Sequence, residues 1–376
     1  MNKKAWIGAV VVVAVVAVAL LIMQSKRPSS KSISLGATFP LSGEVASAGQ
    51  RIRNGIELAV SELNEGRKGP KVAVIFEDDQ NKAALAVGNI KKLLDIDHVI
   101  AILGSAASGC TRAMMPVAIQ RKTVVLSPIS SSVSLSTEGG GFFFRVAPAD
   151  DAQAKVAASW IIKQRKDGVA IVFVNNDWGR SLAESVRDLL AKEKVEIVAF
   201  EGIAESQRDL RTVIEMVRRS GAHILYSPTY PVDGGLLVRQ AREIGLSLEL
   251  VGGDNWGSPE FQTTAGSAVD GCYVIKAIDP SGESYTRFKI AFEKRFGEAP
   301  DSFATWSYDA AKVLIEAIDS TGGKGGAALT RALRQTDREG ASGRIAFDEN
   351  GDLKYPRFGV FRYSGEKLLP VKETEE

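Results

Sequence analysis

The chain has 376 residues, which is more than one ordinary domain needs and fits two. Its composition, with 45% hydrophobic and 24% charged residues, is typical of a packed globular protein and excludes a disordered or fibrous chain. The formal net charge is only +2, so the chain lacks the basic excess that binds a phosphate backbone, and we expect no nucleic-acid partner.

The first element is an apolar segment, residues 5–23, which contains no charged residue and is rich in Val, Ala, Leu and Ile. A helix needs about 20 apolar residues to span a bilayer, so this segment is long enough for a membrane anchor. Lysines precede it and residues 17–19 (AVA) are small, which is also the pattern of a cleavable signal peptide. Residues 1–32 are therefore predicted to be a signal peptide or a membrane anchor plus a linker, and both interpretations stay open.

The next part of the chain alternates between apolar strands and amphipathic helices. The expected strands cover residues 33–39, 72–76, 99–103 and 123–126, and the expected helices cover 49–64, 83–94 and 111–120. The helices show apolar residues at three- and four-residue spacing, whereas the strands are continuous apolar runs, as in sheets buried on both faces. This alternation predicts right-handed strand–helix–strand units and a parallel sheet.

The same pattern restarts near residue 169. Strands are expected at residues 169–174, 196–200, 223–226 and 248–251, separated by helices at 181–192, 209–219 and 232–244. The repetition predicts an α/β fold with two doubly wound parallel-sheet lobes, preceded by the N-terminal apolar helix. Helices are then expected at 285–296 and 305–320. Residues 343–347 and 358–362 alternate like antiparallel strands, and residues 348–352 between them have turn chemistry.

Motifs of enzymes and of metal sites are absent from the sequence. It contains no GxSxG, HExxH or CxxC pattern, and the glycines at 139–141 lack the rest of a phosphate-binding motif. Two His and two Cys are too few for a His- or Cys-rich metal site. We therefore expect that the protein is not an enzyme, has no cofactor or metal, and forms no disulfide between Cys110 and Cys272.

A series of short motifs carries a resemblance to a known family. In chain order the motifs are residues 36–43 (GATFPLSG), 54–60 (NGIELAV), 77–80 (EDDQ), 104–108 (GSAAS), 126–128 (LSP), 144–146 (FRV), 177–179 (DWG), 239–246 (RQAREIGL), 252–254 (GGD), 308–310 (YDA) and 347–353 (FDENGDL). In this order the chain resembles type I periplasmic binding proteins, in the branch that binds branched-chain and other amino acids for ABC importers. The match covers nearly everything from Ile33 to the end.

The resemblance implies two doubly wound lobes joined by a three-segment hinge, with the ligand in the cleft between them. Lobe one would comprise residues 33–148 and 279–345, and lobe two residues 149–278 and 346–376. This arrangement fits the expected α/β units, because open α/β sheets bind ligands beyond the carboxyl ends of their strands.

Three residues match the family positions that hold the carboxylate of an amino acid. Ser108 follows the third strand, and Ile129 and Ser131 follow the fourth, so hydroxyls and main-chain amides would meet the ligand there. A carboxylate needs such N–H and O–H donors, which helix N-termini also supply. Each position has an ordinary alternative, since Ser108 is also a good helix N-cap and the serine-rich segment resembles a solvated loop.

Three further residues match positions on the other lobe. Asp254 follows the strand at 248–251, where the family places an acid on the ligand ammonium, and a charge-assisted hydrogen bond of this kind is strong. Tyr230 and Trp178 match aromatic positions that cover the ligand on closure. Their alternatives are a turn aspartate and ordinary aromatic packing.

One position departs from the family pattern. The residue ahead of Gly49 is often aromatic in branched-chain binders, whereas this chain has Ala48. The small side chain would enlarge the pocket, so the expected ligand is a branched-chain amino acid or a larger or aromatic one.

The function implied by the resemblance is capture of an amino acid outside the cytoplasm and its delivery to an ABC permease in the membrane. The protein would be a monomer, in the periplasm or at the outer face of the cytoplasmic membrane, where residues 5–23 could anchor it. Two alternatives stay open: a membrane-tethered ligand-sensing domain of the same fold, and a binder of a carboxylate or amide that is not an amino acid.

Overall fold

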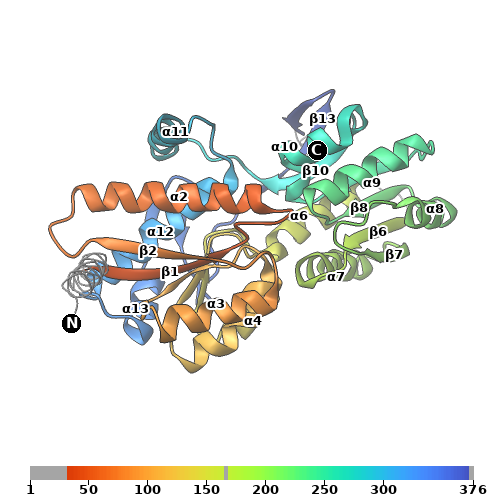
Figure 1. Ribbon diagram of the computed structural model, residues 1–376. Helices are drawn as coiled ribbons and strands as arrows, with labels where there is room; N and C mark the ends of the chain where they lie inside the picture. The colour runs from red at the N-terminus through yellow and green to blue at the C-terminus, as the bar shows by residue number, and fades with distance from the viewer. Residues whose placement is uncertain (1–31, 165–167, 372–376) are drawn as a thin grey trace, which may run out of the picture.

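The structure, a computed structural model, describes residues 32–164 and 168–371. Two α/β bodies lie side by side and share no sheet, as Figure 1 shows. Lobe one is the body built on a five-stranded sheet, and lobe two is the body built on a seven-stranded sheet. The two-lobe α/β architecture predicted from the sequence is confirmed. The predicted N-terminal apolar helix lies outside the described residues.

The sheet of lobe one has the order β2-β1-β3-β4-β5, and all neighbouring strands are parallel. Its strands are β1 (Ile33–Phe39), β2 (Val72–Asp78), β3 (Ile102–Gly104), β4 (Val125–Ser127) and β5 (Phe143–Arg145). Its helices are α2 (Ala46–Glu65), α3 (Ala83–Asp95), α4 (Ser108–Gln120), α5 (Ser134–Glu138), α11 (Glu283–Phe296), α12 (Ser302–Ser320) and α13 (Gly326–Arg334).

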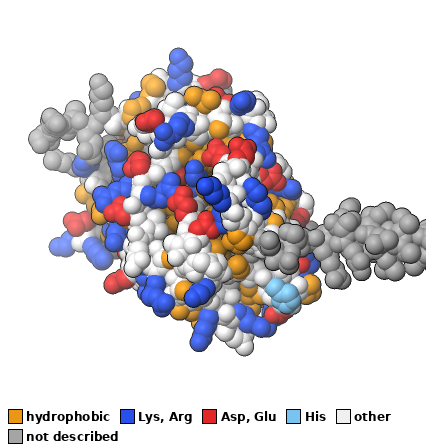
Figure 2. Space-filling model, turned by 90° about the vertical axis from the view of Figure 1, so that its left-hand side faces the viewer, with side chains coloured by type: hydrophobic (Ala, Val, Ile, Leu, Met, Phe, Trp, Pro, Cys, Tyr) orange, Lys and Arg blue, Asp and Glu red, His pale blue; other side chains and the backbone are white. Residues whose placement is uncertain are grey.

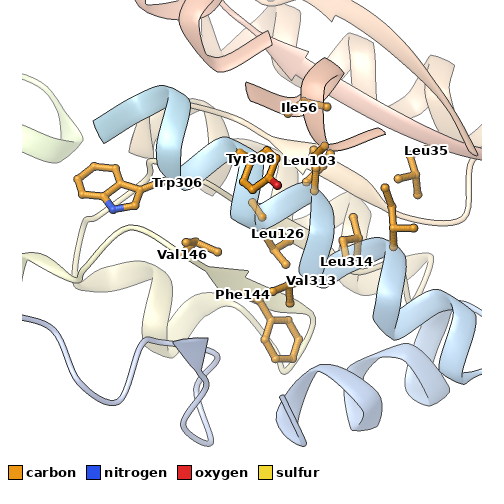
Figure 3. Packing of buried hydrophobic residues seen from close by; sticks show 14 of the residues in the cluster. Leu35, Ile56, Leu103, Leu126, Phe144, Val146, Trp306, Tyr308, Val313 and Leu314 are labelled. Atoms are coloured by element: carbon orange, nitrogen blue, oxygen red, sulfur yellow. The ribbon is translucent and has the colours of Figure 1, made fainter. Parts of the chain in front are cut away.

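Successive residues of these short strands face opposite sides of the sheet, and each side has its own hydrophobic core. Leu103, Leu126 and Phe144 pack with helices α2 and α12, as Figure 3 shows for residues that include Ile56 and Leu314. The preceding residues of the same strands, for example Ile102 and Val125, pack on the other side with α3 and α4. The continuous apolar runs in the sequence therefore reflect burial on both faces.

The sheet of lobe two has the order β14-β13-β10-β9-β8-β6-β7. Its strands are β6 (Val169–Val174), β7 (Ile197–Ile203), β8 (Ile224–Ser227), β9 (Glu249–Gly252), β10 (Tyr273–Ala277), β13 (Phe358–Ser364) and β14 (Lys367–Pro370). Its helices are α6 (Asp150–Lys163), α7 (Asp177–Lys192), α8 (Arg211–Arg219), α9 (Pro231–Glu243) and α10 (Pro259–Ala265), with two 3-10 turns, η1 (Asp254–Gly257) and η2 (Gly266–Val269). Alternate strand residues again divide between two cores, one with α8 and α9 and one with α6 and α7.

The C-terminal strands differ from the sequence prediction. Strand β12 (Gly343–Ala346) pairs with β11 (Asp337–Gly340), whereas β13 pairs antiparallel with β10 and β14. The two predicted strands are thus not each other's partners, because the segment between them carries the chain from one lobe to the other. Phe347 is buried in the core of lobe one.

The distribution of charged side chains agrees with the small net charge. Basic and acidic side chains are interspersed over the face shown in Figure 2. Cys110 and Cys272 are both buried and free, and they belong to cores of different lobes. Within residues 32–164 and 168–371, no helix combines the length and apolarity needed to cross a membrane.

Candidate ligand-binding cleft

A cavity of about 850 Å³ lies between the lobes and is lined by residues of both. Lobe one lines it with the segments after β3 and β4, and lobe two with those after β6, β8 and β9. These are the carboxyl ends of parallel strands, the usual ligand site of open α/β sheets. The six residues predicted from the sequence all line this one cavity: Ser108, Ile129, Ser131, Trp178, Tyr230 and Asp254.

The wall formed by lobe one presents hydrogen-bond donors. Ser108 is the first residue of α4 rather than its N-cap, and its Oγ accepts a hydrogen bond of 3.2 Å from the amide of Ser132. Its hydroxyl proton is left for the cavity. The Ile129 amide already donates to Ser127 Oγ at 3.1 Å, so it has no proton to spare for a ligand in this conformation. Ser131 has the spare amide of this loop, since that amide has no acceptor among the described residues.

The wall formed by lobe two presents a carboxylate. Asp254 begins the turn η1 directly after β9, and its side chain is half-buried. Burial raises the pKa of this carboxyl, while hydrogen bonds from the Asn255 amide and from Gln153 and the attraction of Lys276 oppose the shift. A cationic group of a ligand would favour the ionised form and relieve the cost of burial.

An aromatic pair covers the same wall. Trp178, near the start of α7, and Tyr230, the N-cap of α9, stack with ring centroids 5.5 Å apart and an interplanar angle of 3°. The Tyr230 hydroxyl accepts a hydrogen bond of 3.1 Å from Asn176 Nδ2. The two rings form a flat apolar surface that can cover the side chain of a ligand.

A second acid beside the cleft was missed by the sequence analysis. Asp150, at the start of α6, is almost fully buried, and its Oδ2 has no hydrogen-bond partner among residues 32–164 and 168–371. Burial raises its pKa to about 7, helped by repulsion from Asp254, while the charge of Arg145 and the nearby polar groups of Ser131 and Trp178 oppose the shift. The only sequence signal was an acidic residue in the first turn of a helix, which is common for other reasons.

The structure has polar contacts across the rim of the cleft. Ion pairs between described residues of the two lobes include Arg112–Asp177 at 2.7 Å, Arg51–Glu260 at 2.9 Å and Arg208–Glu44 at 3.5 Å. The first of them is bidentate, because Arg112 Nε also lies 3.2 Å from Asp177 Oδ2. These pairs are partly exposed, so each contributes about 1 kcal/mol or less.

Comparisons with known proteins agree with this geometry. A family profile described as "Periplasmic binding protein" matches residues 32–357. A Leu/Ile/Val-binding protein homolog of Brucella melitensis is 26% identical over 90% of this chain and 94% of its own length. An amino acid binding protein of Pseudomonas aeruginosa is 28% identical over 88% of this chain and 90% of its own length.

A solved structure shows the same likeness. The branched-chain amino acid transporter substrate binding protein of Streptococcus pneumoniae, in complex with isoleucine, has a TM-score of 0.81 and 26% identity to this chain. The match covers 90% of this chain and 98% of that protein.

Proposed function

Because the chain belongs to the periplasmic binding protein family, a family of extracytoplasmic binding proteins and not of enzymes, we propose that it captures a free amino acid in the cleft and delivers it to an ABC transporter. The relatives support the ligand class, since one is named for Leu, Ile and Val and another holds isoleucine. Capture and delivery would be carried out by a monomer.

The observation that carries this proposal is the pairing of opposite chemistries across one cavity. Lobe one offers the Ser108 hydroxyl, the Ser131 amide and the N-terminus of α4, which suit a carboxylate. Lobe two offers Asp254, which suits an ammonium. A zwitterion satisfies both walls at once, whereas a plain carboxylate would leave the acid without a partner.

The proposed side chain of the ligand is branched or larger. Ala48 lines the cavity, together with the stacked rings of Trp178 and Tyr230. A small residue at this position leaves room for a long or aromatic side chain, and the flat aromatic surface would cover it.

Ligand capture would proceed by closure of the lobes about three connections. These connections are the segments between β5 and α6, between β10 and α11, and between β12 and β13. The ligand would dock on lobe one, and lobe two would then bring Asp254 and Tyr230 against it. Contacts made only in the closed state would shift the population towards it, and the transporter would recognise that state.

The role of the N-terminal segment is a separate part of the proposal. Family membership implies an extracytoplasmic location, and residues 5–23 would direct the chain there either as a cleaved signal or as an anchor. N-terminal sequencing of the mature protein from its native membrane fraction and from its soluble fraction distinguishes the two: a new N-terminus after residue 19 supports cleavage, and an intact one supports the anchor.

Asp254→Asn tests the proposed function most simply, because it removes the charge and keeps the shape. We expect the affinity for L-leucine or L-phenylalanine, measured by calorimetry, to fall by about 3–5 kcal/mol, since the ammonium becomes a buried charge without its counter-ion. Asp188→Asn, an exposed acid of α7, is the matched control and should bind like the wild type. Unchanged affinity in Asp254→Asn would remove this acid from the site.

A further inference from the structure

Arg145 stands out as a fully buried cation that does not line the cleft. It is the last residue of β5, and its guanidinium makes hydrogen bonds in three directions. Nε donates to Asp352 Oδ1 at 2.7 Å, Nη1 to the carbonyl of Ser132 at 2.8 Å, and Nη2 to Ser136 Oγ at 2.6 Å. Burial of an arginine is costly unless its charge and its donors find partners. Here Asp352 pairs with the charge, and each of the three nitrogens has an acceptor.

The carbonyls that Arg145 holds flank the donor loop of the cleft. Nη1 also lies 3.4 Å from the Ser130 carbonyl, so the guanidinium contacts the residues on both sides of Ser131. The amide of Ser132 in turn donates to Ser108 Oγ. The orientation of both serines that face the cavity therefore depends on where this loop is held.

The other partner of Arg145 lies on a connection between the lobes. Asp352 belongs to the segment between β12 and β13, and the Arg145 amide donates to the Gly351 carbonyl at 3.0 Å. Gly351 has φ 87°, and a Cβ there would lie 2.1 Å from the Phe143 carbonyl, so only glycine permits this approach. The connection is thus fixed against the last residue of β5, just ahead of the segment that leads the chain into lobe two.

We propose that Arg145 is a positioning residue for the carboxylate end of the ligand: its fork holds the Ser130–Ser132 loop against the Asp352 segment so that the Ser108 and Ser131 donors converge. This inference rests on the proposed function. An arginine suits the role because its planar fork fixes several acceptors in one geometry, which an ammonium cannot do. It is no ligand contact itself, and it acts through the serines that are.

The test compares ligands with and without a carboxylate. Arg145→Lys keeps the positive charge beside Asp352 but loses the planar guanidinium that holds several acceptors at once. Calorimetry would measure binding of L-leucine and L-phenylalanine, and of their C-terminal amides, to the full chain. We expect a loss of about tenfold or more for the amino acids and a much smaller loss for the amides, so the ratio of the two affinities falls. A residue that only stabilises the fold would weaken both ligands alike.

Two further variants keep the test decisive. Ser136→Ala removes one acceptor of the fork without touching the ion pair, so it remains informative if Arg145→Lys does not fold, and its ratio should shift in the same direction by about threefold. Arg121→Lys, at an exposed ion pair with Asp95, is the control and should leave both affinities unchanged.

The outcomes separate the two proposals. If the wild type binds neither amino acid, the proposed function fails and the positioning role fails with it. If the wild type binds the amino acids better than the amides but the folded variants keep the wild-type ratio, only the positioning role of Arg145 is overturned.

Discussion

The two walls of the cleft are built in opposite ways. On lobe one, internal hydrogen bonds hold the donor loop: Ser127 Oγ and Ser108 Oγ accept from its amides, and Arg145 donates to its carbonyls. The Ser131 amide has no acceptor among the described residues and stays free for a ligand. On lobe two, burial raises the pKa of Asp150 and Asp254, and within the described part of the chain no donor reaches Asp150 Oδ2 or Gln153 Oε1. Buried acceptors without a hydrogen bond destabilise the protein, and a donor supplied by a ligand would remove that cost.

This difference indicates that the wall of lobe one is already arranged for a ligand before binding, whereas the wall of lobe two is not. A wall whose free donors are already held in position can dock the anionic end of a ligand without rearrangement, while a wall of underpaired acceptors gains most when a cation enters. The proposed order of events, docking on lobe one followed by closure of lobe two, follows from this asymmetry.

Removal of a donor from the lobe-one wall should have a large effect on affinity. Ser108→Ala deletes the hydroxyl that faces the cavity and also leaves the Ser132 amide without its acceptor. We expect the affinity for an amino acid, measured by calorimetry, to fall by about 2–3 kcal/mol. Most of this loss should come from weaker contacts with the ligand carboxylate. Ser185→Ala, a serine of α7 that bonds only within its helix, should bind like the wild type. Wild-type affinity in Ser108→Ala would break the account of lobe one.

The buried acid Asp150 on lobe two predicts that ligand affinity depends on pH. The pKa of Asp150 is about 7 without ligand, and a bound ammonium should lower it, so binding releases a proton below pH 7. Affinity should therefore rise with pH by up to about tenfold per unit up to about 7 and level off above it. Calorimetry in buffers of different ionisation enthalpy measures the released proton, and Asp150→Asn should abolish that release. A flat profile from pH 5.5 to 8 in the wild type would contradict this linkage.

The same acid sets the sign of the stability change in the ligand-free protein. The folded-state pKa of Asp150 is raised above the unfolded value, so the folded state binds more protons between about 4 and 7. The free energy of unfolding should therefore fall as pH rises through this range. Asp150→Asn should flatten that slope in denaturant titrations, and an equal slope in both proteins would exclude this acid as its source.

The pocket for the ligand side chain offers a selectivity test. Ala48→Trp places a large ring into the cavity that Ala48 lines. We expect affinity for L-phenylalanine to fall by about 1–3 kcal/mol through overpacking, and affinity for L-valine to fall much less. Competition calorimetry with the two amino acids measures the ratio. A loss of equal size for both would mean that the side chain of the ligand points elsewhere.

The rim contacts should have the smallest effect. Arg112→Ala removes the bidentate pair with Asp177 that joins the lobes. The expected loss of affinity is about 0.5–1 kcal/mol and should vanish at high salt, because the pair is partly exposed. A stopped-flow measurement should show the loss as faster ligand release. A loss that persists at 1 M salt would assign Arg112 a different role.

The fold was largely predictable because the strands carry a strong signal. Residues such as Leu103 and Ile102 are buried on opposite faces of the same sheet, which produces a continuous apolar run. Helix α6 was missed because most of its buried side chains are small or polar, such as Gln153, Ala154 and Ala157, and these give little apolar periodicity. The partner of β13 was missed because strand pairing over long separations leaves no local trace.

The cleft was predictable to a different degree. The six residues that were predicted and that line the cavity were identified through the resemblance to a family, not from their chemistry alone. The roles of Asp150 and Arg145 were not predicted, because the sequence does not show whether an individual acidic or basic side chain is exposed or buried. The engagement of the Ile129 amide by Ser127 is equally invisible, since it depends on backbone direction.

The most direct test of the central claim is a ligand series on the unaltered protein. Calorimetry would compare L-leucine with leucinamide, which lacks the carboxylate, and with 4-methylpentanoate, which lacks the amine. The account predicts that both analogues bind at least about tenfold more weakly than leucine, because each leaves one wall of the cleft without its partner. Equal affinity for leucine and 4-methylpentanoate would contradict it, because Asp254 would then have no ammonium to bind.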